Sequence, residues 1–430
     1  MIKIFTTIHT TPDVRSYRTH SFENIYEVLS KITDVQIIWL VYKPEKIDSK
    51  KHSNKNNIIL DIHDFKNAVD AINSTKPDLI WAAPTLNLPD FAISLAGKKL
   101  GIPVVGELVN ELFTKDNELE LFKTYISHFF QKSVPTDNEK DNKRFMKRGR
   151  FFLYKYRFLF NTQRIIGWNI IKIVKYFFIL IKAHLTVYKN LHDPRFSCDI
   201  HFVETESLVE KLIYKGYDKK KLIVTGIPMY DSATKKIQEL EKIKIVNDRT
   251  NVLFLTHAMY EHGIWTRTQR DLLIKKIITE LCKHKDKFLV TVKIHPSSES
   301  ISDYESIINP IDKTIKIFQK SDLLEHIVNS DIIITYSGAS SLVYALMCKK
   351  PIIVCNFYGL KNDIFVERGI VIECKNEKEI ISIIEGTKNN NILNENKIKK
   401  FTEEFFYRLD GKASERISNE IIKIIKNREK

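Results

Sequence analysis

The clearest chemical signal in the chain is a histidine and a group of serines, each placed where a predicted strand ends. The apolar run 288–296 closes on His295 and Pro296. A second apolar run, 331–337, leads into four small residues: Ser337, Gly338, Ser340 and Ser341. A Gly/Ser turn that opens a helix offers free backbone N–H groups, hydroxyls and the positive end of the helix dipole. Although a strand-end histidine or a serine cap is common by itself, together they predict a phosphate site.

Two further segments carry polar residues at corresponding places. The sequence LTHAMYEHGIW begins at the end of the run 251–257 and contains His257, Tyr260, Glu261, His262 and Gly263. The alternative for this segment is a polar surface loop. The sequence TGIPMYD, from Thr225 to Asp231 and including Gly226, begins at the end of the run 221–228.

Short apolar runs rich in β-branched residues alternate with amphipathic stretches along most of the chain. In the first part they are 1–8, 35–42, 57–62, 78–84, 103–108, 198–205 and 221–228. In the second part they are 251–257, 288–296, 314–318, 331–337 and 351–357. Strands of this kind alternating with helices predict an α/β fold with parallel sheets. We therefore expect two doubly wound, Rossmann-like domains that face a ligand cleft at the carboxyl ends of their strands.

The 430 residues divide by this pattern into three parts. Residues 1–235 are predicted to form the first, acceptor-side domain, with a helical insertion at about 125–192. Residues 246–390 are predicted to form the second, donor-binding domain, and residues 391–430 two C-terminal helices. The charged stretch from Ser232 to Arg249 is the expected linker.

The insertion is strongly basic. Residues 143–189 contain twelve Lys or Arg and no Asp or Glu, and so hold twelve of the fifteen net positive charges. Helical spacing gathers one apolar side: Ile165, Trp168, Ile171, Ile173, Val174, Phe177, Phe178 and Ile181. Basic amphipathic helices of this kind bind membrane surfaces, so we expect residues 144–190 to contact an anionic membrane. Packing on the domain alone is the alternative; no nucleic acid is expected, because no motif for one accompanies the segment.

The remaining composition narrows the class of protein. The five cysteines are scattered, without a CxxC pair, which argues against a disulfide framework or a zinc site. The N-terminal MIKIFTTIHTT lacks the features of a signal peptide. Uncharged stretches are too short to span a bilayer. The expected place is the cytoplasm, peripherally on the inner face of the cell membrane.

The arrangement in 195–390 resembles GT-B fold transferases of surface polymers: capsule polysaccharide, CDP-glycerol and HP-motif sialyltransferases. In those families an HP dipeptide and a downstream Ser/Thr pair bind donor phosphates, which implies this role for His295, Pro296, Ser340 and Ser341, with Ser337 beside them. The related nonhydrolysing UDP-GlcNAc 2-epimerases share the fold and a TGxPxxD entry similar to 225–231. The loop at His257 is weakly similar to their THRxEN motif, but it lacks the arginine.

The resemblance implies an inverting transfer, in which a base of the first domain deprotonates the acceptor hydroxyl. The candidates are Glu107 after the fifth predicted strand, then His9 and Asp13 after the first. Glu111, and Asn87 and Asp90 after the fourth strand, are near these positions. Capping or solvent exposure is the alternative for each. No carboxylate cluster suggests a metal, and no cofactor is expected beyond a CMP-, CDP- or UDP-linked donor.

Three functions remain open. The first is a metal-independent glycosyl- or glycerophosphotransferase of cell-surface polysaccharide synthesis, acting on a lipid-linked or glycan acceptor. The second is an NDP-sugar 2-epimerase, for which TTIHTTPDVRSY stands in place of a GTRPE-like phosphate loop. The third is a noncatalytic scaffold on the membrane surface.

Overall fold

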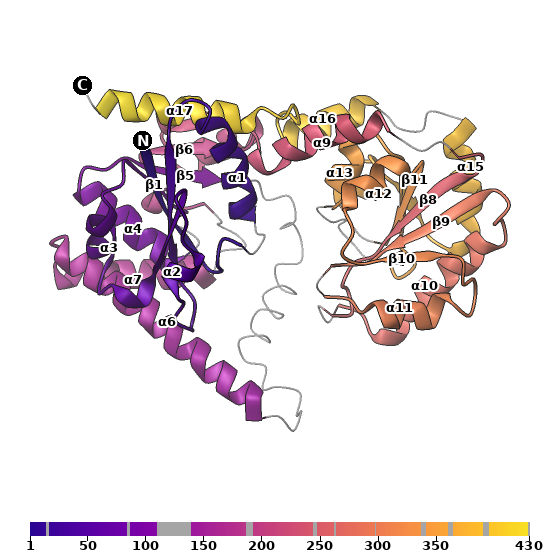
Figure 1. Cartoon of the computed structure of the whole chain (residues 1–430), viewed down its shortest axis with the longest axis horizontal. Helices are drawn as coiled ribbons and strands as arrows, with labels where there is room; N and C mark the ends of the chain where they lie inside the picture. The colour runs from indigo at the N-terminus through magenta and orange to yellow at the C-terminus, as the bar shows by residue number, and fades with distance from the viewer. Residues whose placement is uncertain are drawn as a thin grey trace. The chain divides into compact units, whose positions relative to one another are not determined.

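The chain folds into two compact units, described below from a computed structural model (Figure 1). Unit 1 comprises Met1–Asp231 and Glu404–Lys430, and unit 2 comprises Ser232–Glu403. The structure describes residues 1–13, 17–83, 87–109, 139–185, 192–243, 247–261, 264–296, 298–336, 341–359, 364–389 and 395–428.

Unit 1 is built on a seven-stranded parallel sheet with the strand order β3-β2-β1-β4-β5-β6-β7. The strands are β1 Ile2–Ile8, β2 Val35–Val41, β3 Asn57–Asp61, β4 Leu79–Trp81, β5 Val104–Leu108, β6 Ile200–Val203 and β7 Leu222–Val224. Both faces are covered, so the strands are apolar on both sides. Along β1, for example, Ile4 and Ile8 face one core and Phe5 faces the other.

Helices pack on each face of this sheet (Figure 1). One face is covered by α1 Tyr17–Leu29 and α17 Ala413–Arg428, which supply Phe22, Ile25, Ile417 and Ile421 to the core. The other face is covered by α3 Ala68–Thr75, α4 Leu88–Lys99, α6 Glu139–Ile165 and α7 Ile170–Leu185. The shorter helices are α2 Ser49–His52, η1 Ile62–Asp64, η2 Pro194–Phe196, α8 Glu206–Tyr214, η3 Lys219–Lys221 and η4 Pro228–Tyr230.

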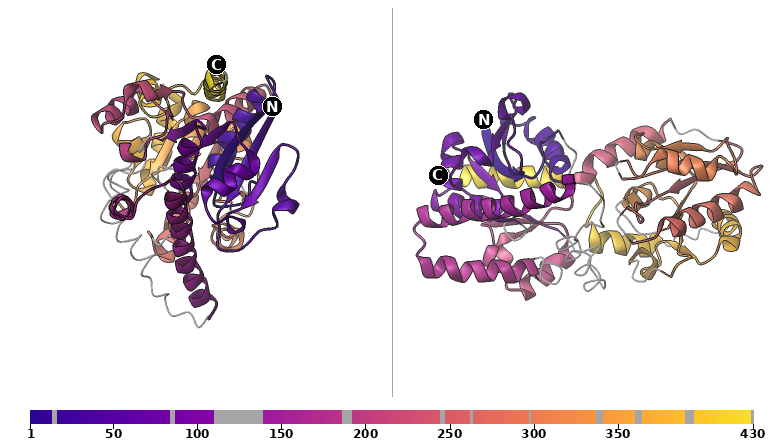
Figure 2. Two further views of the ribbon diagram at one scale, coloured as in Figure 1. Left: turned by 90° about the vertical axis from the view of Figure 1, so that its left-hand side faces the viewer. Right: turned by 90° about the horizontal axis from the view of Figure 1, so that it is seen from below.

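The basic insertion forms the two helices α6 and α7, which run side by side (Figure 2). Phe158 and Leu159 of α6 and Leu180 of α7 enter the core of unit 1. Tyr156 of α6 meets Phe177 of α7 edge-on, with ring centroids 5.0 Å apart. Within the described residues, no helix has the length and apolar character needed to cross a membrane.

Unit 2 holds a six-stranded parallel sheet with the order β10-β9-β8-β11-β12-β13. Its strands are β8 Thr250–Leu255, β9 Phe288–Lys293, β10 Lys316–Phe318, β11 Ile332–Thr335, β12 Ile352–Cys355 and β13 Ile372–Cys374. Its helices are α9 Asp231–Glu241, α10 Arg267–Cys282, α11 Ile301–Ile308, α12 Leu323–Asn329, α13 Ser341–Met347, α14 Ile364–Glu367, η5 Glu377–Glu379, α15 Ile380–Asn389 and α16 Glu395–Phe405. The predicted class, two doubly wound parallel α/β domains, is confirmed.

The segments around the unit boundaries differ from the simple scheme of a linker and a separate tail. Most of the expected linker is helical: α9 buries Ala233 and Ile237, which are one turn apart. The two C-terminal helices belong to different units, since α17 packs on the sheet of unit 1. Asp231 accepts the backbone N–H groups of Ala413 and Ser414, at 3.2 and 2.6 Å, and so caps the start of α17.

Candidate active site

The motif loops of unit 2 meet at one edge of its sheet. Strands β8 and β11 are central neighbours, and the sheet continues from β8 to β9 and from β11 to β12. The carboxyl ends of such a pair, where the order reverses, are the usual ligand site of an open α/β sheet. His257 follows β8, His295 follows β9, and Ser341 begins α13 after β11. The fold therefore brings His257, His295 and Ser341 to one edge of the sheet.

His257 is held by Tyr336, a residue that the sequence analysis did not select. The backbone N–H of His257 donates to the Tyr336 hydroxyl at 2.7 Å, and that hydroxyl donates to the His257 carbonyl at 2.6 Å. Burial, and after it the charge of His295, lower the pKa of His257 to about 4. The imidazole is therefore neutral at pH 7 and lies close enough to His295 for their charges to interact.

His295 is oriented by its own loop. Its backbone N–H donates to the Glu299 carboxylate at 2.6 Å, and the Ser298 N–H donates to its Nδ1 at 3.2 Å. Because Nδ1 accepts, a neutral His295 carries its proton on Nε2. Glu299, only 4 % exposed, also accepts from the hydroxyls of Thr256 and Tyr304. This buried carboxylate fixes the HP loop, while Pro296 itself is exposed.

Three buried polar atoms at this edge have no hydrogen-bond partner within the described part of the chain: His257 Nε2, Thr335 Oγ1 and Ser341 Oγ. Thr335 ends β11 and Ser341 begins α13. An unpartnered buried polar atom is costly, so such atoms mark places that a ligand or water satisfies. A phosphate, with several acceptor oxygens, fits this donor set. The predicted residues Ser337, Gly338 and Ser340 lie outside the described residues.

The loop that carries Tyr260 is anchored from beneath rather than being a loose surface loop. Arg270 of α10, fully buried, donates to Glu261 at 3.0 Å and lies under the Tyr260 ring at 5.1 Å. It also pairs with Asp271 and Asp303, at 2.8 and 3.5 Å. Glu261 is thus an anchor, and Tyr260, 40 % exposed, is displayed to solvent. His262 and Gly263 lie outside the described residues.

Gly226 lies in unit 1 and not in this cluster. Its φ of +78° is in the left-handed region that favours glycine. A Cβ here would lie 3.2 Å from Nη2 of Arg416 and 3.6 Å from Cβ of Ala413. Arg416 in turn donates to the Thr225 carbonyl at 2.7 Å. Gly226 therefore lies close to the start of α17 and to the backbone of Arg408.

In unit 1, Glu107 is the predicted base with the most structured surroundings. It is half-buried near the carboxyl end of β5, and the Tyr17 hydroxyl donates to its Oε1 at 2.6 Å. The same hydroxyl lies 3.1 Å from Glu204, a buried carboxylate that follows β6. Burial raises the pKa of Glu107, partly offset by the Tyr17 hydrogen bond and the Arg18 charge. The pKa of Tyr17 is also raised, so the phenol keeps its proton.

Arg18 and Asp90 tie the start of α1 to the start of α4. Arg18 donates to the Thr7 carbonyl at 2.7 Å and pairs with the fully buried Asp90 at 3.2 Å. Asn87 caps α4 by accepting the Asp90 N–H at 2.8 Å. Asn87 and Asp90 thus have structural partners, and Arg18 places a positive charge near Glu107.

His9 and Asp13 are both exposed after β1. Burial and the charge of Arg18 lower the pKa of His9, which leaves its imidazole neutral at pH 7. The pKa of Asp13 is lowered as well, chiefly by a hydrogen bond from Thr11, and its carboxylate lies 3.9 Å from His52. A lowered pKa makes Asp13 a weak base. Glu111 lies outside the described residues.

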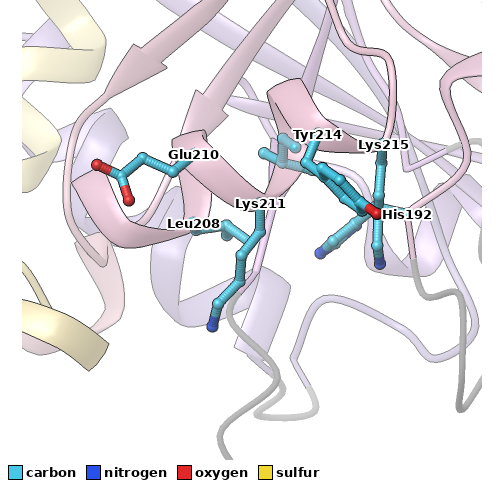
Figure 3. Close-up of a pocket in the computed structure, with 7 residues that line it drawn as sticks. His192, Leu208, Glu210, Lys211, Tyr214 and Lys215 are labelled. Carbon is cyan, nitrogen blue, oxygen red and sulfur yellow. The ribbon is translucent and has the colours of Figure 1, made fainter.

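A separate cavity of about 370 Å³ lies beside α8 in unit 1 (Figure 3). Lys211, Tyr214 and Lys215 of that helix line it, together with His192. The Nε2 of His192 lies 2.8 Å from the Val109 carbonyl, one residue after β5. None of the predicted site residues lines this cavity.

All five cysteines are free thiols, and four of them are buried. Among the described residues, no group of three His, Cys, Asp or Glu side chains is arranged to hold a metal ion.

Comparison with known proteins identifies the family. The sequence profile of the UDP-N-acetylglucosamine 2-epimerase family matches residues 196–422, just over half of the chain. The chain belongs to this family. No curated protein matches it in sequence. The family region begins in unit 1, includes all of unit 2 and ends within α17.

Solved structures share the whole fold at low identity. The Staphylococcus aureus MnaA–UDP co-structure is 16 % identical over 99 % of this chain and 97 % of that one, with a TM-score of 0.51. A UDP-N-acetylglucosamine 2-epimerase, described as putative, from Listeria monocytogenes is 14 % identical over 99 % and 97 %, with a TM-score of 0.53. The wall teichoic acid polymerase TagF is 14 % identical over 99 % and 90 %, also with 0.53. These likenesses confirm the GT-B fold, which the putative epimerase and the teichoic acid polymerase share.

The buried histidine gives a testable pH dependence. Because the pKa of His257 is about 4 in the folded protein and about 6.5 when unfolded, folding disfavours its protonation. Its contribution to stability is full above pH 6.5 and is lost as the pH falls toward 4. Urea unfolding followed by the fluorine NMR signal of 5-fluorotryptophan at Trp265, whose ring centroid lies 5.0 Å from that of Tyr336, measures this loss in unit 2. We expect a shallower decline between pH 6.5 and 4 in His257→Gln than in the wild type; parallel curves would contradict it.

Proposed function

We propose that the protein is a metal-independent transferase that moves a sugar or glycerophosphate from a nucleotide-activated donor to an acceptor of cell-surface polysaccharide synthesis. Unit 2 binds the donor, and Glu107 of unit 1 takes the proton of the acceptor hydroxyl. The observation that carries the donor site is the set of three unpartnered polar atoms, His257 Nε2, Thr335 Oγ1 and Ser341 Oγ, at the switch point of unit 2. We further propose a lipid-linked or glycan acceptor, met at the inner face of the cell membrane.

A 2-epimerase is the second candidate, and family membership favours it. Two features of the chain favour a transferase instead. Ala258, 3 % exposed, stands where the epimerase motif THRxEN has its arginine, so that cation is missing. The loop after β1 has the sequence HTTPD in place of a GTRPE-like loop.

One experiment separates the two candidates. With UDP-GlcNAc in D₂O, an epimerase breaks the C2–H bond and returns a nucleotide-linked sugar that carries deuterium at that carbon. A transferase releases the nucleotide only when an acceptor is present. NMR of the sugar after incubation reports both events. Deuterium at C2 without acceptor would overturn the transferase proposal.

Donor binding can be tested before the substrate is known. Thermal shifts with CMP, CDP, UDP and GDP identify the nucleotide, and titration then compares the variants His257→Ala, His295→Ala and Ser341→Ala. Each loses a hydrogen bond to a charged phosphate, about 1.5–3 kcal/mol, so we expect affinity to fall roughly tenfold to a hundredfold. His284→Ala is the matched control: this histidine is also half-buried in unit 2, but it precedes β9 rather than following it. If all three variants bind the nucleotide with wild-type affinity, the phosphate is not bound at this edge of the sheet.

A further inference from the structure

Helix α7 presents apolar side chains on two different sides, although the sequence predicted one. Ile173 and Leu180, each 3 % exposed, are buried, and Leu180 joins the core of unit 1. A second set points away from that core and forms what we call the outer face: Ile170, Ile171, Val174, Phe178 and Ile181. Their exposed fractions run from 41 % for Ile181 to 77 % for Ile171. At about 100° per residue, all five lie within roughly one quadrant of the helix.

Positive charge borders the outer face. At the same helical spacing, Lys175 and Lys182 lie next to it, and Lys172 lies farther round, with its ammonium 4.3 Å from the Trp168 ring centroid. All three lysines and Arg164 near the end of α6 are exposed. No acidic residue occurs between positions 143 and 189, so the segment carries a net positive charge.

The row of apolar side chains and the lysines beside it indicate which kind of partner fits the outer face. Single exposed apolar residues are ordinary, but a contiguous row on one helix is a feature of interaction sites. A second copy docked two-fold through this face would bring the same cations against each other. Phe178 is the one aromatic residue of the outer face, whereas proteins that bind single strands stack successive bases on several aromatic side chains. An anionic lipid leaflet accepts both the apolar row and the lysines.

We propose that the outer face of α7 inserts into the interfacial region of an anionic lipid leaflet, with Lys175 and Lys182 on the phosphate headgroups. The helix, with 16 residues, lies in the plane of the leaflet and does not span it. Membrane binding by α7 does not depend on the proposed function. Only its purpose does: it would hold unit 1 at the leaflet that contains a lipid-linked acceptor.

Vesicle sedimentation of the full-length protein tests the surface. We expect binding to phosphatidylcholine vesicles containing phosphatidylglycerol, weakening steeply with salt, and little binding to phosphatidylcholine alone. Ile171→Ser with Phe178→Ser should lower the partition coefficient at least tenfold, since burying one such side chain contributes roughly a factor of ten or more. Lys175→Gln with Lys182→Gln should lower it and flatten the salt dependence. Ile213→Ser with Tyr214→Ser, on exposed positions of α8, is the matched control and should bind like wild type.

A depth probe separates insertion from electrostatic adsorption. Phe178→Cys carrying an environment-sensitive fluorophore, in a Cys282→Ser background, should shift to the blue with anionic vesicles, while Tyr214→Cys should not. Equal binding to both vesicle types, no binding to either, or a fluorophore without a blue shift would overturn the proposal. If the wild type forms concentration-dependent dimers that are lost in Ile171→Ser with Phe178→Ser, the outer face binds a second copy of the chain instead. Nucleotide affinity of these variants is measured in parallel. The nucleotide affinity of these variants should stay at the wild-type value. A negative result in the vesicle experiments would therefore contradict the membrane proposal without contradicting the proposed donor site.

Discussion

Glu107→Gln is expected to lower turnover by roughly a hundredfold to ten-thousandfold while donor affinity stays at its wild-type value. This is the usual contribution of a positioned general base. The amide keeps an oxygen to accept the Tyr17 hydroxyl, which donates to Glu107 at 2.6 Å in the wild type, so the local geometry is preserved. Only the ability to take a proton is lost. Steady-state kinetics with a saturating donor, alongside nucleotide titration, measure the two effects separately.

The pH profile of the wild type adds a second readout. Since burial raises the pKa of Glu107, the acidic limb of the rate should lie above the usual range of a glutamate. The base is active when ionised, so the rate falls as the pH drops through that value. Glu373→Gln is the matched control, because this half-buried glutamate in β13 of unit 2 also accepts a hydrogen bond, from Asn356 at 2.8 Å. A fully active Glu107→Gln would move the role to His9, whose neutral imidazole is the better remaining base.

Arg270→Met is expected to destabilise unit 2 by about 3 kcal/mol. Removing one partner of a buried ion pair costs about 3–5 kcal/mol because charge is left unpaired. The lower end applies because Glu261, Asp271 and Asp303 keep side-chain exposures of 19–34 % and can be partly hydrated. The Tyr260 loop also loses its anchor, so donor affinity should fall as well. Urea unfolding followed at Trp265 gives the free energy.

A neighbour on the same helix provides the control. Arg267 is 59 % exposed and pairs with Asp303 at 3.1 Å and Asp271 at 3.8 Å, two of the acids that Arg270 contacts. Surface pairs contribute about 0–1 kcal/mol, so Arg267→Met should change stability little. Equal losses in the two variants would show that burial of Arg270 is not what makes it important.

Strands were the part of the fold most readily predicted from sequence. Runs such as 35–42 and 288–296 are dense in β-branched residues, because strands covered on both faces need apolar side chains throughout. Strand β13 was missed, since its three residues, Ile372–Cys374, are too short to form a recognisable run. For α9 the sequence favours a linker, because most of its residues are polar or charged and its apolar contribution is confined to one stripe.

Within the site, position along the chain could be predicted but contacts could not. The sequence singles out His257, His295 and Ser341 because strand ends mark ligand loops in parallel sheets. Tyr336, which holds His257, is 79 residues away in sequence, and nothing local signals that pair. Glu299 had a weak signal, four residues after His295 in HPSSES. For α7, periodicity identified apolar residues but not which of them face the core, because that depends on the packing of α6 and the sheet.

The return of the chain to unit 1 at Glu404 has a consequence for synthesis on the ribosome. The sheet of unit 1 is covered on one face by α17, whose Ile417 and Ile421 belong to the same core as Ile4 and Trp81. Every residue of unit 2 is translated before those two isoleucines. Domains of a growing chain usually complete their folding from the N-terminus onward. Here the order is inverted: unit 1 keeps one face of its sheet only partly covered, by α1, until α17 leaves the exit tunnel, and unit 2 is complete before it.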